Sequence, residues 1–142
     1  MNATAETTPS PRDYGIEPRR LALPADTMSV ADARYHVRRT LKRFPRLDDA
    51  LICTSELVTN AIVHGSERRD ALIVVVIHRE DAFARITVED SGGRSEPRLV
   101  WAQTRAEHFR GLMLVDALAD CWGVYATSLG AHHVWFEMAA TR

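Results

Sequence analysis

Three polar side chains at helical spacing are the first candidates for chemistry. Glu56 and Asn60 stand four residues apart, and His64 continues the row after another four. Residues at this spacing lie on one face of a helix, so a carboxylate, an amide and an imidazole line up beside an apolar stripe. Such a row can form one wall of a polar ligand site, but it is equally compatible with a helix face that is only solvated.

A second candidate is Asp90, at the end of an alternating segment that reads as a strand. The alternation places its carboxylate on the face that carries Ala84, Ile86 and Val88, and therefore toward a buried layer. A lone buried carboxylate is costly unless a ligand offers donors, and the exocyclic amine of adenine is such a donor. The alternative is an aspartate that only initiates the turn after the strand.

Glycines near these residues leave room for a ligand. Gly92 and Gly93 directly follow the strand and allow the backbone to approach a flat ring closely. Gly111 stands where a long loop, residues 91–108, is expected to enter a helix, and the free amides of a helix start suit phosphate oxygens. Capping explains a glycine at that place equally well. A loop of this length is usually functional, and we expect it to act as a lid.

Composition and charge restrict the class of protein. The 142 residues suit one globular domain, expected over residues 19–142 after a flexible leader at residues 1–18 that is rich in Thr, Ser, Pro and Ala. The net charge of -1 disfavours non-specific binding of nucleic acid. The longest apolar run, Ala71 to Ile77, is far too short to span a membrane, so we expect a cytoplasmic protein.

The cysteines and histidines predict no metal site made by the protein alone. Cys53 and Cys121 are far apart in the sequence, which is typical of reduced, packed thiols. His132 and His133 are neighbours on an expected strand, so they point to opposite faces and cannot both bind one ion.

Hydrophobic periodicity predicts the elements that position these residues. Apolar residues at intervals of three and four predict helices from Ser29 to Pro45, from Asp48 to His64 and from Gly111 to Ala119. Strands are expected at residues 20–23, 71–78, 83–90, 121–127 and 132–138. The predicted order of elements is βααββαββ.

The first of these helices is predicted to be amphipathic and basic. Ser29-Val-Ala-Asp32 has the spacing of a capping box. The faces away from the apolar stripe carry five basic residues: Arg34, Arg38, Arg39, Lys42 and Arg43. A basic run of this kind is usually a solvated face, and the alternative is a contact surface for a partner protein or a second subunit.

Three segments, in this order and spacing, resemble the ATP-binding domain of the GHKL superfamily, which unites histidine-kinase catalytic domains, gyrase-type ATPases and anti-sigma-factor serine kinases. Ser55-Glu-Leu-Val-Thr-Asn60-Ala-Ile-Val-His64 is similar to the N-box, Val88-Glu-Asp90-Ser-Gly92-Gly to the first glycine box, and Arg110-Gly-Leu-Met-Leu-Val115 to the second. The segment from Asp116 to Val124 is similar to that of the small anti-sigma-kinase-like ATPases. The resemblance covers residues 19–138.

The resemblance implies a Bergerat fold. This is an α/β (α+β) two-layer sandwich in which a mostly antiparallel sheet carries three helices on one face and ATP is held beneath a lid. In such a site Asn60 would ligate the Mg²⁺ that bridges the phosphates, Glu56 would orient or deprotonate the attacking hydroxyl, and Asp90 would bind adenine. The other nucleotide contacts would come from His64, Gly92, Gly93, Arg94, Arg110, Gly111 and Leu112.

The resemblance also implies an activity and partners. Members of this size phosphorylate a serine or threonine of a small anti-anti-sigma (STAS-type) protein and, in their other state, hold a sigma factor. The chain is therefore expected to be an ATP-binding anti-sigma factor and serine/threonine protein kinase. A homodimer is compatible with this expectation. The catalytic half of a histidine kinase is disfavoured, because no dimerisation helix pair precedes Arg19.

Two positions depart from the family's pattern. Phe109 stands where the second glycine box usually has its first glycine, and Arg94 where the first box often has its second. Phenylalanine disfavours positive backbone dihedrals, which predicts weaker affinity or turnover, whereas Arg94 could reach a phosphate as a cation. Glu56, Asn60 and Asp90 favour retained ATP binding. Two hypotheses stay open: a working kinase that switches partners, and a weak or inactive module that regulates by protein capture alone.

Overall fold

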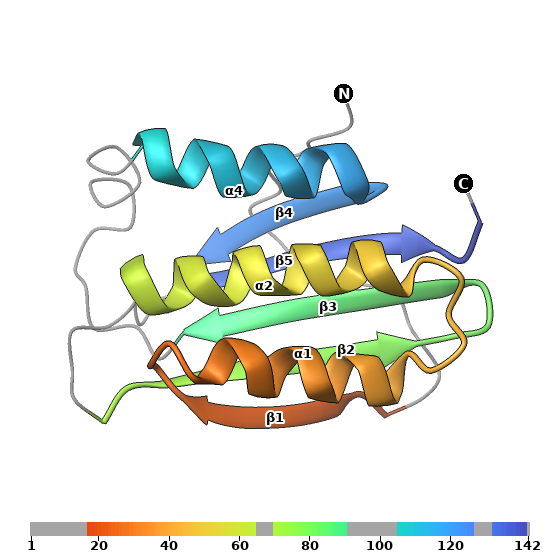
Figure 1. The fold of residues 1–142 in the computed structure, drawn as a ribbon, viewed down its shortest axis with the longest axis horizontal. Helices are drawn as coiled ribbons and strands as arrows, with labels where there is room; N and C mark the ends of the chain where they lie inside the picture. Colours follow the sequence, from red (N-terminus) through yellow and green to blue (C-terminus); the bar gives the residue numbers. More distant parts are fainter. Residues whose placement is uncertain (1–16, 65–69, 91–104, 127–131, 142) are drawn as a thin grey trace.

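In the part of the chain that the structure describes, a five-stranded antiparallel sheet forms one layer, and three helices cover one of its faces (Figure 1). The computed structural model describes residues 17–64, 70–90, 105–126 and 132–141. In chain order the elements are β1 (Arg19–Pro24), α1 (Ser29–Thr40), α2 (Leu47–His64), β2 (Leu72–Arg79), β3 (Phe83–Asp90), α4 (Arg105–Leu118), β4 (Cys121–Ala126) and β5 (His132–Ala139). The predicted order and the two-layer α+β fold are confirmed.

The strands lie in the order β1-β2-β3-β5-β4, so β5 returns between β3 and β4. Hairpins join β2 to β3 and β4 to β5, and their register sets which side chains meet. Asp90 pairs with Ile73 at one end of the sheet, whereas Arg19 pairs with Ile77 toward the other. The sheet therefore has two chemically different ends.

The core lies between the sheet and the helices, as the apolar periodicity predicts. The stripe of α1 is buried at Ala33 and Val37, and α2 buries Leu57 and Val58 above Phe136 and its neighbours on the sheet. Truncation of a side chain as buried as Leu57 to alanine typically costs about 2–5 kcal/mol. Apolar burial of this kind fixes the helices on the sheet.

The ends of α1 differ from the prediction. The N-cap residue is Met28, whose side chain makes no capping hydrogen bond, and Ser29 Oγ donates to the carbonyl of Pro24 at 2.5 Å. The predicted capping box is therefore wrong. The helix ends at Thr40, before Pro45, because residues beyond it form tight turns that include Arg43 at a φ of 66°.

The beginning of α4 also differs from the prediction. The helix begins at Arg105, six residues before the predicted start at Gly111, so Gly111 lies inside the helix and not at its entry. A single glycine is tolerated within a helix at a cost of about 1 kcal/mol relative to alanine. The sequence Thr104-Arg-Ala-Glu107 has capping-box spacing and is the signal that the prediction missed.

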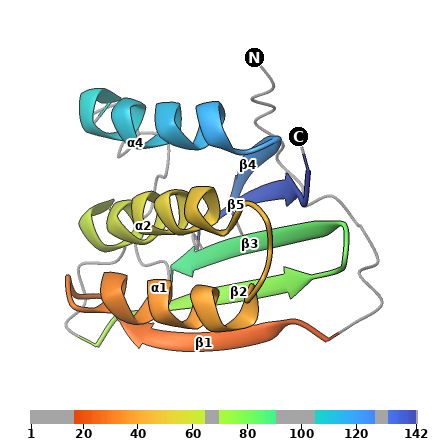
Figure 2. The same cartoon turned by 45° about the vertical axis from the view of Figure 1, so that its right-hand side comes forward.

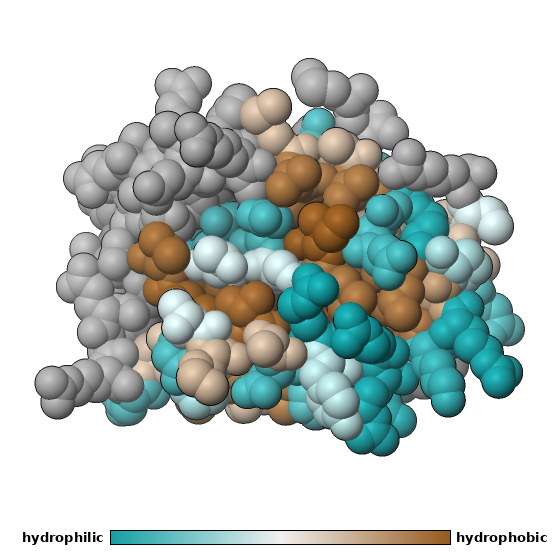
Figure 3. All heavy atoms as spheres, in the orientation of Figure 1, coloured by the Kyte–Doolittle hydropathy of each residue, from teal (hydrophilic) through white to brown (hydrophobic). Residues whose placement is uncertain are grey.

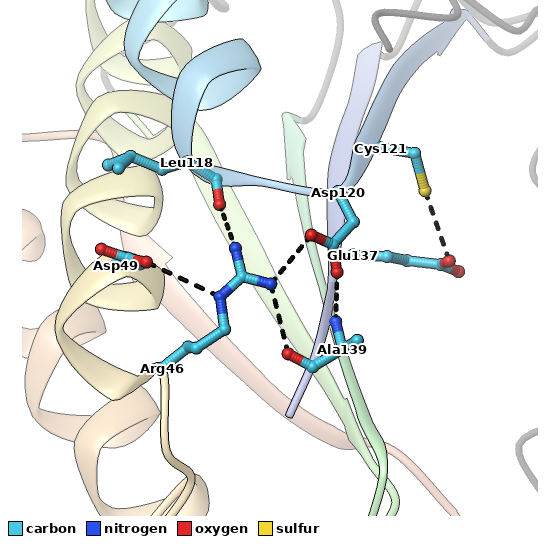
Figure 4. A network of polar contacts seen from close by, with 7 residues as sticks. All are labelled: Arg46, Asp49, Leu118, Asp120, Cys121, Glu137 and Ala139. Carbon is cyan, nitrogen blue, oxygen red and sulfur yellow. Dashed lines mark hydrogen bonds and ion pairs between the residues drawn. The ribbon is translucent and has the colours of Figure 1, made fainter. Parts of the chain in front are cut away.

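A polar cluster joins the N-terminal end of α2 to α4 and the sheet (Figure 4). Arg46 Nη1 donates to Asp120 Oδ1 at 2.8 Å and to the carbonyl of Ala139 at 3.2 Å. Its Nη2 donates to the carbonyl of Leu118, and its Nε lies 3.6 Å from Asp49 Oδ2. We call this group of five residues the Arg46 clamp. It ties three elements together through one guanidinium.

The sheet face opposite the helices carries a buried ion pair. Arg85 Nη1 lies 3.2 Å from Glu137 Oε1, and both side chains are almost fully buried. The Arg85 guanidinium also lies 4.0 Å from the centre of the Trp135 ring, which packs so closely on Gly123 that a Cβ there would lie 2.8 Å from the ring. Gly123 is therefore required by the close approach of the indole.

Both cysteines are free, as predicted. Burial raises the pKa of the Cys53 thiol to about 12, and the nearby Asp49 carboxylate adds to this shift. Cys53 is therefore an inert packing residue. Within the described ranges no helix is long and apolar enough to cross a membrane. The predicted leader at residues 1–18 lies largely outside these ranges and stays a prediction.

Candidate functional site

Four elements meet at one end of the molecule. The C-terminal ends of α2 and β3 lie there with the N-terminal end of α4 and the start of β5, on the left in Figure 1 and again in Figure 2. The Arg46 clamp lies at the opposite end, where α2 begins and α4 ends. The first of these ends carries Asn60, Asp90 and His132, and we call it the site end.

Asp90 is buried at the site end, as predicted, with its side chain 7% exposed. It is not a lone carboxylate, however, and that part of the prediction is wrong. The backbone amide of His132 donates to Asp90 Oδ1 at 3.0 Å, and His132 Nδ1 lies 3.2 Å from Oδ2. The register explains this contact, because Glu89 pairs with His133 and the next positions bring Asp90 beside His132.

His132 is a site residue that the sequence reasoning missed. Its side chain is 9% exposed, and within the described ranges its buried Nε2 atom has no hydrogen-bond partner. With Nδ1 turned to Asp90, the ring presents Nε2 as its second polar atom. The predicted opposite orientation of the two neighbouring histidines is confirmed, since His133 Nδ1 instead lies 3.5 Å from Glu89 Oε1.

Asn60 carries the second unpaired polar atom at this end. The residue is half-buried, and its Nδ2 atom is buried with no hydrogen-bond partner among the described residues. Leaving a buried amide nitrogen unpaired typically costs about 1–3 kcal/mol, a cost that bound ligand atoms can remove. The oxygen and nitrogen of an amide exchange places by a simple rotation, so Asn60 can turn its oxygen to a cation. The residue thus fits a Mg²⁺ ion held through phosphates.

Glu56 is half-buried on α2, one turn before Asn60. Its helical turn is held by Arg34 of α1, whose Nη1 donates to Ser55 Oγ at 2.6 Å and to the carbonyl of Leu51 at 3.2 Å. Arg34 is therefore not part of a free basic face, contrary to the prediction. Its position four residues after Val30, on the apolar stripe, is the signal that could have shown this.

The remaining predicted site residues are only partly covered by the structure. Gly92, Gly93 and Arg94 lie outside the described residues, as does most of the predicted lid. The backbone of His64 ends α2, while Phe109, Arg110 and Gly111 lie within α4. Leu112 is half-buried and packs on the core. These positions stay predictions.

Comparison with known proteins identifies this arrangement. The model of the histidine kinase-like ATPase domain matches residues 23–136, which spans every element of the described fold except the start of β1 and the end of β5. The chain belongs to the histidine kinase-like ATPase family. The resemblance to the GHKL superfamily is thereby confirmed, and a family of this kind binds ATP.

A solved structure shows the same fold. The chain is similar to a structure of the RsbU and RsbW domains of Rv1364c from Mycobacterium tuberculosis, with a TM-score of 0.64 and 21% identity over 87% of this chain. The match covers 32% of that longer chain. A search of curated proteins found no match to this histidine kinase-like ATPase.

Proposed function

We propose that this histidine kinase-like ATPase binds Mg·ATP at the site end and transfers the γ-phosphoryl group to a serine or threonine of a partner protein. The observation that carries the proposal is the Asn60 amide, whose buried nitrogen has no partner in the described part of the chain, at the end of the fold that also buries Asp90. An unpaired polar atom is expensive in a folded protein unless a ligand satisfies it.

Two residues are proposed to read the base. Asp90 accepts the exocyclic amine of adenine while it keeps the backbone amide of His132 as its second partner. Nε2 of His132, buried and unpaired, is available to the ligand or to its ordered water. The proposed contacts from His64, Gly92, Gly93, Arg94, Arg110, Gly111 and Leu112 complete the site.

Asn60 and Glu56 are proposed to act at the phosphates. Asn60 would hold Mg²⁺, and the bound ion would neutralise charge that develops on the phosphoryl oxygens. Glu56 accepts the proton of the attacking hydroxyl as the new bond from oxygen to phosphorus forms and the bond to the β-phosphate oxygen breaks, which leaves ADP. Arg34 positions the turn of α2 that carries this carboxylate.

The partner chemistry follows from the family resemblance. We propose that the acceptor is a STAS-type anti-anti-sigma protein and that the chain, in its other state, holds a sigma factor in the cytoplasm, as a monomer or a homodimer. The similarity to a structure that contains an RsbW domain, at low identity, supports the fold on which this proposal rests.

A second candidate function is regulation by protein capture with weak or absent catalysis. It is favoured by the position of Gly111 inside α4, because amides within a helix are engaged by the helix itself and are not free for phosphates. The substitution of Phe109 for a family glycine points the same way.

Phosphotransfer by Glu56→Ala tests the proposal. Using radiolabelled ATP and an acceptor co-purified from native extract, we expect the variant to keep its ATP affinity within about threefold and to lose about 100-fold or more in transfer rate. The Glu56→Gln variant, whose side chain has the same size but cannot accept the proton, should lose nearly as much of the transfer rate. Equal transfer by wild type and both variants excludes Glu56 as the base, and a wild type that captures the acceptor without transfer supports the second candidate.

A further inference from the structure

A cavity lies between α1 and β1, away from the site end. Its volume is about 460 Å³, and its lining consists of Arg19, Arg20, Leu21, His36, Arg39, Thr40 and Ile77. The cavity sits where β1 begins and α1 ends, on the right in Figure 1, whereas Asp90 closes β3 on the left. Nothing in the proposed nucleotide chemistry uses it.

The cavity is strongly cationic. Three guanidinium groups and one imidazole line it, and no carboxylate is among its lining residues. Glu89 Oε1 lies 3.7 Å from Arg20 Nη1, but the Arg20 side chain is 61% exposed, so this ion pair is weak. Hydrophilic side chains gather on the surface over this end of α1 in Figure 3. Because the whole chain has a net charge of -1, the positive charge is a local feature.

The cationic groups are held in place by their neighbours. Nη1 of Arg39 donates to the Tyr35 hydroxyl at 3.2 Å, and its Cζ lies 5.7 Å from the centre of the Tyr35 ring. Nη1 of Arg79 donates to the carbonyls of Thr40 at 3.1 Å and Lys42 at 2.7 Å, which fixes the end of α1 against the sheet. The cavity therefore has a defined wall as well as a charge.

The adjoining strand has a free edge. β1 is the outermost strand of the sheet, and among the described strands it pairs only with β2. Its outer backbone groups can therefore pair with another extended chain. Leu21 and Ile77 supply an apolar floor between the cationic side chains.

We propose that this cavity and the edge of β1 dock an extended acidic segment of a partner protein. The segment lies as an added strand along β1 and places carboxylates against Arg19 and Arg39, where bidentate pairing with guanidinium is available. A second copy of this chain fits poorly, because its own β1 edge, Arg19–Pro24, carries no carboxylate that could pair with these guanidinium groups. This docking does not depend on nucleotide.

The test is a fluorescence anisotropy titration of the full chain with a labelled eight-residue peptide of alternating Glu and Val. In an added strand the carboxylates of this peptide all share one face. We expect saturable binding that Arg19→Glu with Arg39→Glu weakens at least tenfold. The matched control is Arg38→Glu with Lys42→Glu, which changes charge equally at exposed residues outside the cavity lining and should weaken binding less than threefold.

Peptides distinguish the mode of binding. A Lys and Val peptide should not bind, and a Glu and Pro peptide should bind at least tenfold more weakly because proline cannot donate to a strand. No binding of the Glu and Val peptide, equal loss in both double variants, or equal binding of the Glu and Pro peptide overturns the proposal. So does a wild-type dimer that Arg19→Glu with Arg39→Glu converts to a monomer in sedimentation.

ATP titrations of the same variants separate this proposal from the nucleotide site. The double variant Arg19→Glu with Arg39→Glu should keep the ATP affinity and the unfolding temperature of the wild type. The Asp90→Asn variant should no longer bind ATP but should bind the peptide as the wild type does. Loss of the peptide together with ATP in Asp90→Asn would contradict an independent docking surface.

Discussion

The two ends of the helical layer differ in how their buried polar groups are hydrogen-bonded. At one end both Nη atoms of Arg46 are hydrogen-bonded by the protein itself, to two carbonyls and the Asp120 carboxylate, while its Nε lies 3.6 Å from Asp49 Oδ2 and makes no hydrogen bond among the described residues. At the site end Asn60 Nδ2 and His132 Nε2 are buried, and no described residue forms a hydrogen bond with either atom. The same helix, α2, begins at the first end and carries Asn60 near the second. Polar burial at the clamp end stabilises the fold, and at the site end it leaves capacity for a ligand.

Arg46→Ala should produce the largest loss of stability. The Arg46 side chain is 8% exposed and the Asp120 side chain 41%, so the ion pair is only partly desolvated. Removing it together with the bonds to Leu118 and Ala139 should lower the free energy of unfolding by about 2–4 kcal/mol. Urea unfolding measures this. The control Arg38→Ala, at an exposed position of α1, should change the free energy of unfolding by less than about 0.5 kcal/mol. Equal losses in the two variants would show that the Arg46 clamp does not stabilise the fold.

Asn60→Leu should separate stability from binding. Because the Nδ2 atom has no partner to lose, the free energy of unfolding should change by less than about 1 kcal/mol or rise. The affinity for Mg·ATP should fall at least tenfold, about 1.4 kcal/mol. Thr59→Ala, at the exposed neighbour, should leave both quantities unchanged. A stability loss as large as that of Arg46→Ala would show that Asn60 is a structural residue.

Two histidines on the sheet face opposite the helices should give the smallest effect. Burial lowers the pKa of His78, near the clamp end, and of His133, near the site end, below the ordinary value of 6.5. The nearby Arg85 also lowers the pKa of His78, whereas Glu89 partly opposes the shift of His133. The unfolded chain therefore binds more protons, and stability should fall as the pH drops below about 6.5.

Urea unfolding at pH 7.5 and 5.5 measures this dependence. Replacing both histidines, His78→Gln with His133→Gln, should reduce the loss of stability on acidification. An unchanged pH dependence in the double variant would show that other groups, rather than these imidazoles, are responsible.

Local patterns in the sequence predicted most of the fold. Alternation over Phe83–Asp90 gave β3 with its observed bounds, and the stripe through Leu57 and Val58 gave the buried face of α2. Both patterns arise because one side of the strand or helix is buried, and this one-sided burial can be predicted from the sequence of that segment alone. The predicted burial of Asp90 follows from the same alternation and is also confirmed.

The contacts that define the site depend on distant segments. His132 meets Asp90 only through the pairing of β3 with β5, and Arg34 reaches Ser55 only because α1 packs on α2. Neither partner could be assigned from one segment alone. The beginning of α4 was misplaced for a different reason, since Gly111 was taken as a boundary although helices tolerate an isolated glycine.

The most direct test of the account is the unfolding temperature of the wild type with and without Mg·ATP. At a ligand concentration of about 100 times Kd, binding to the folded state alone should stabilise it by about 2.7 kcal/mol, which corresponds to a rise in Tm of roughly 8 °C for a chain of this size. The Tm of the Asp90→Asn variant should rise by less than about 2 °C when Mg·ATP is added under the same conditions. A wild type whose Tm does not respond to Mg·ATP would contradict a nucleotide site at this end of the molecule.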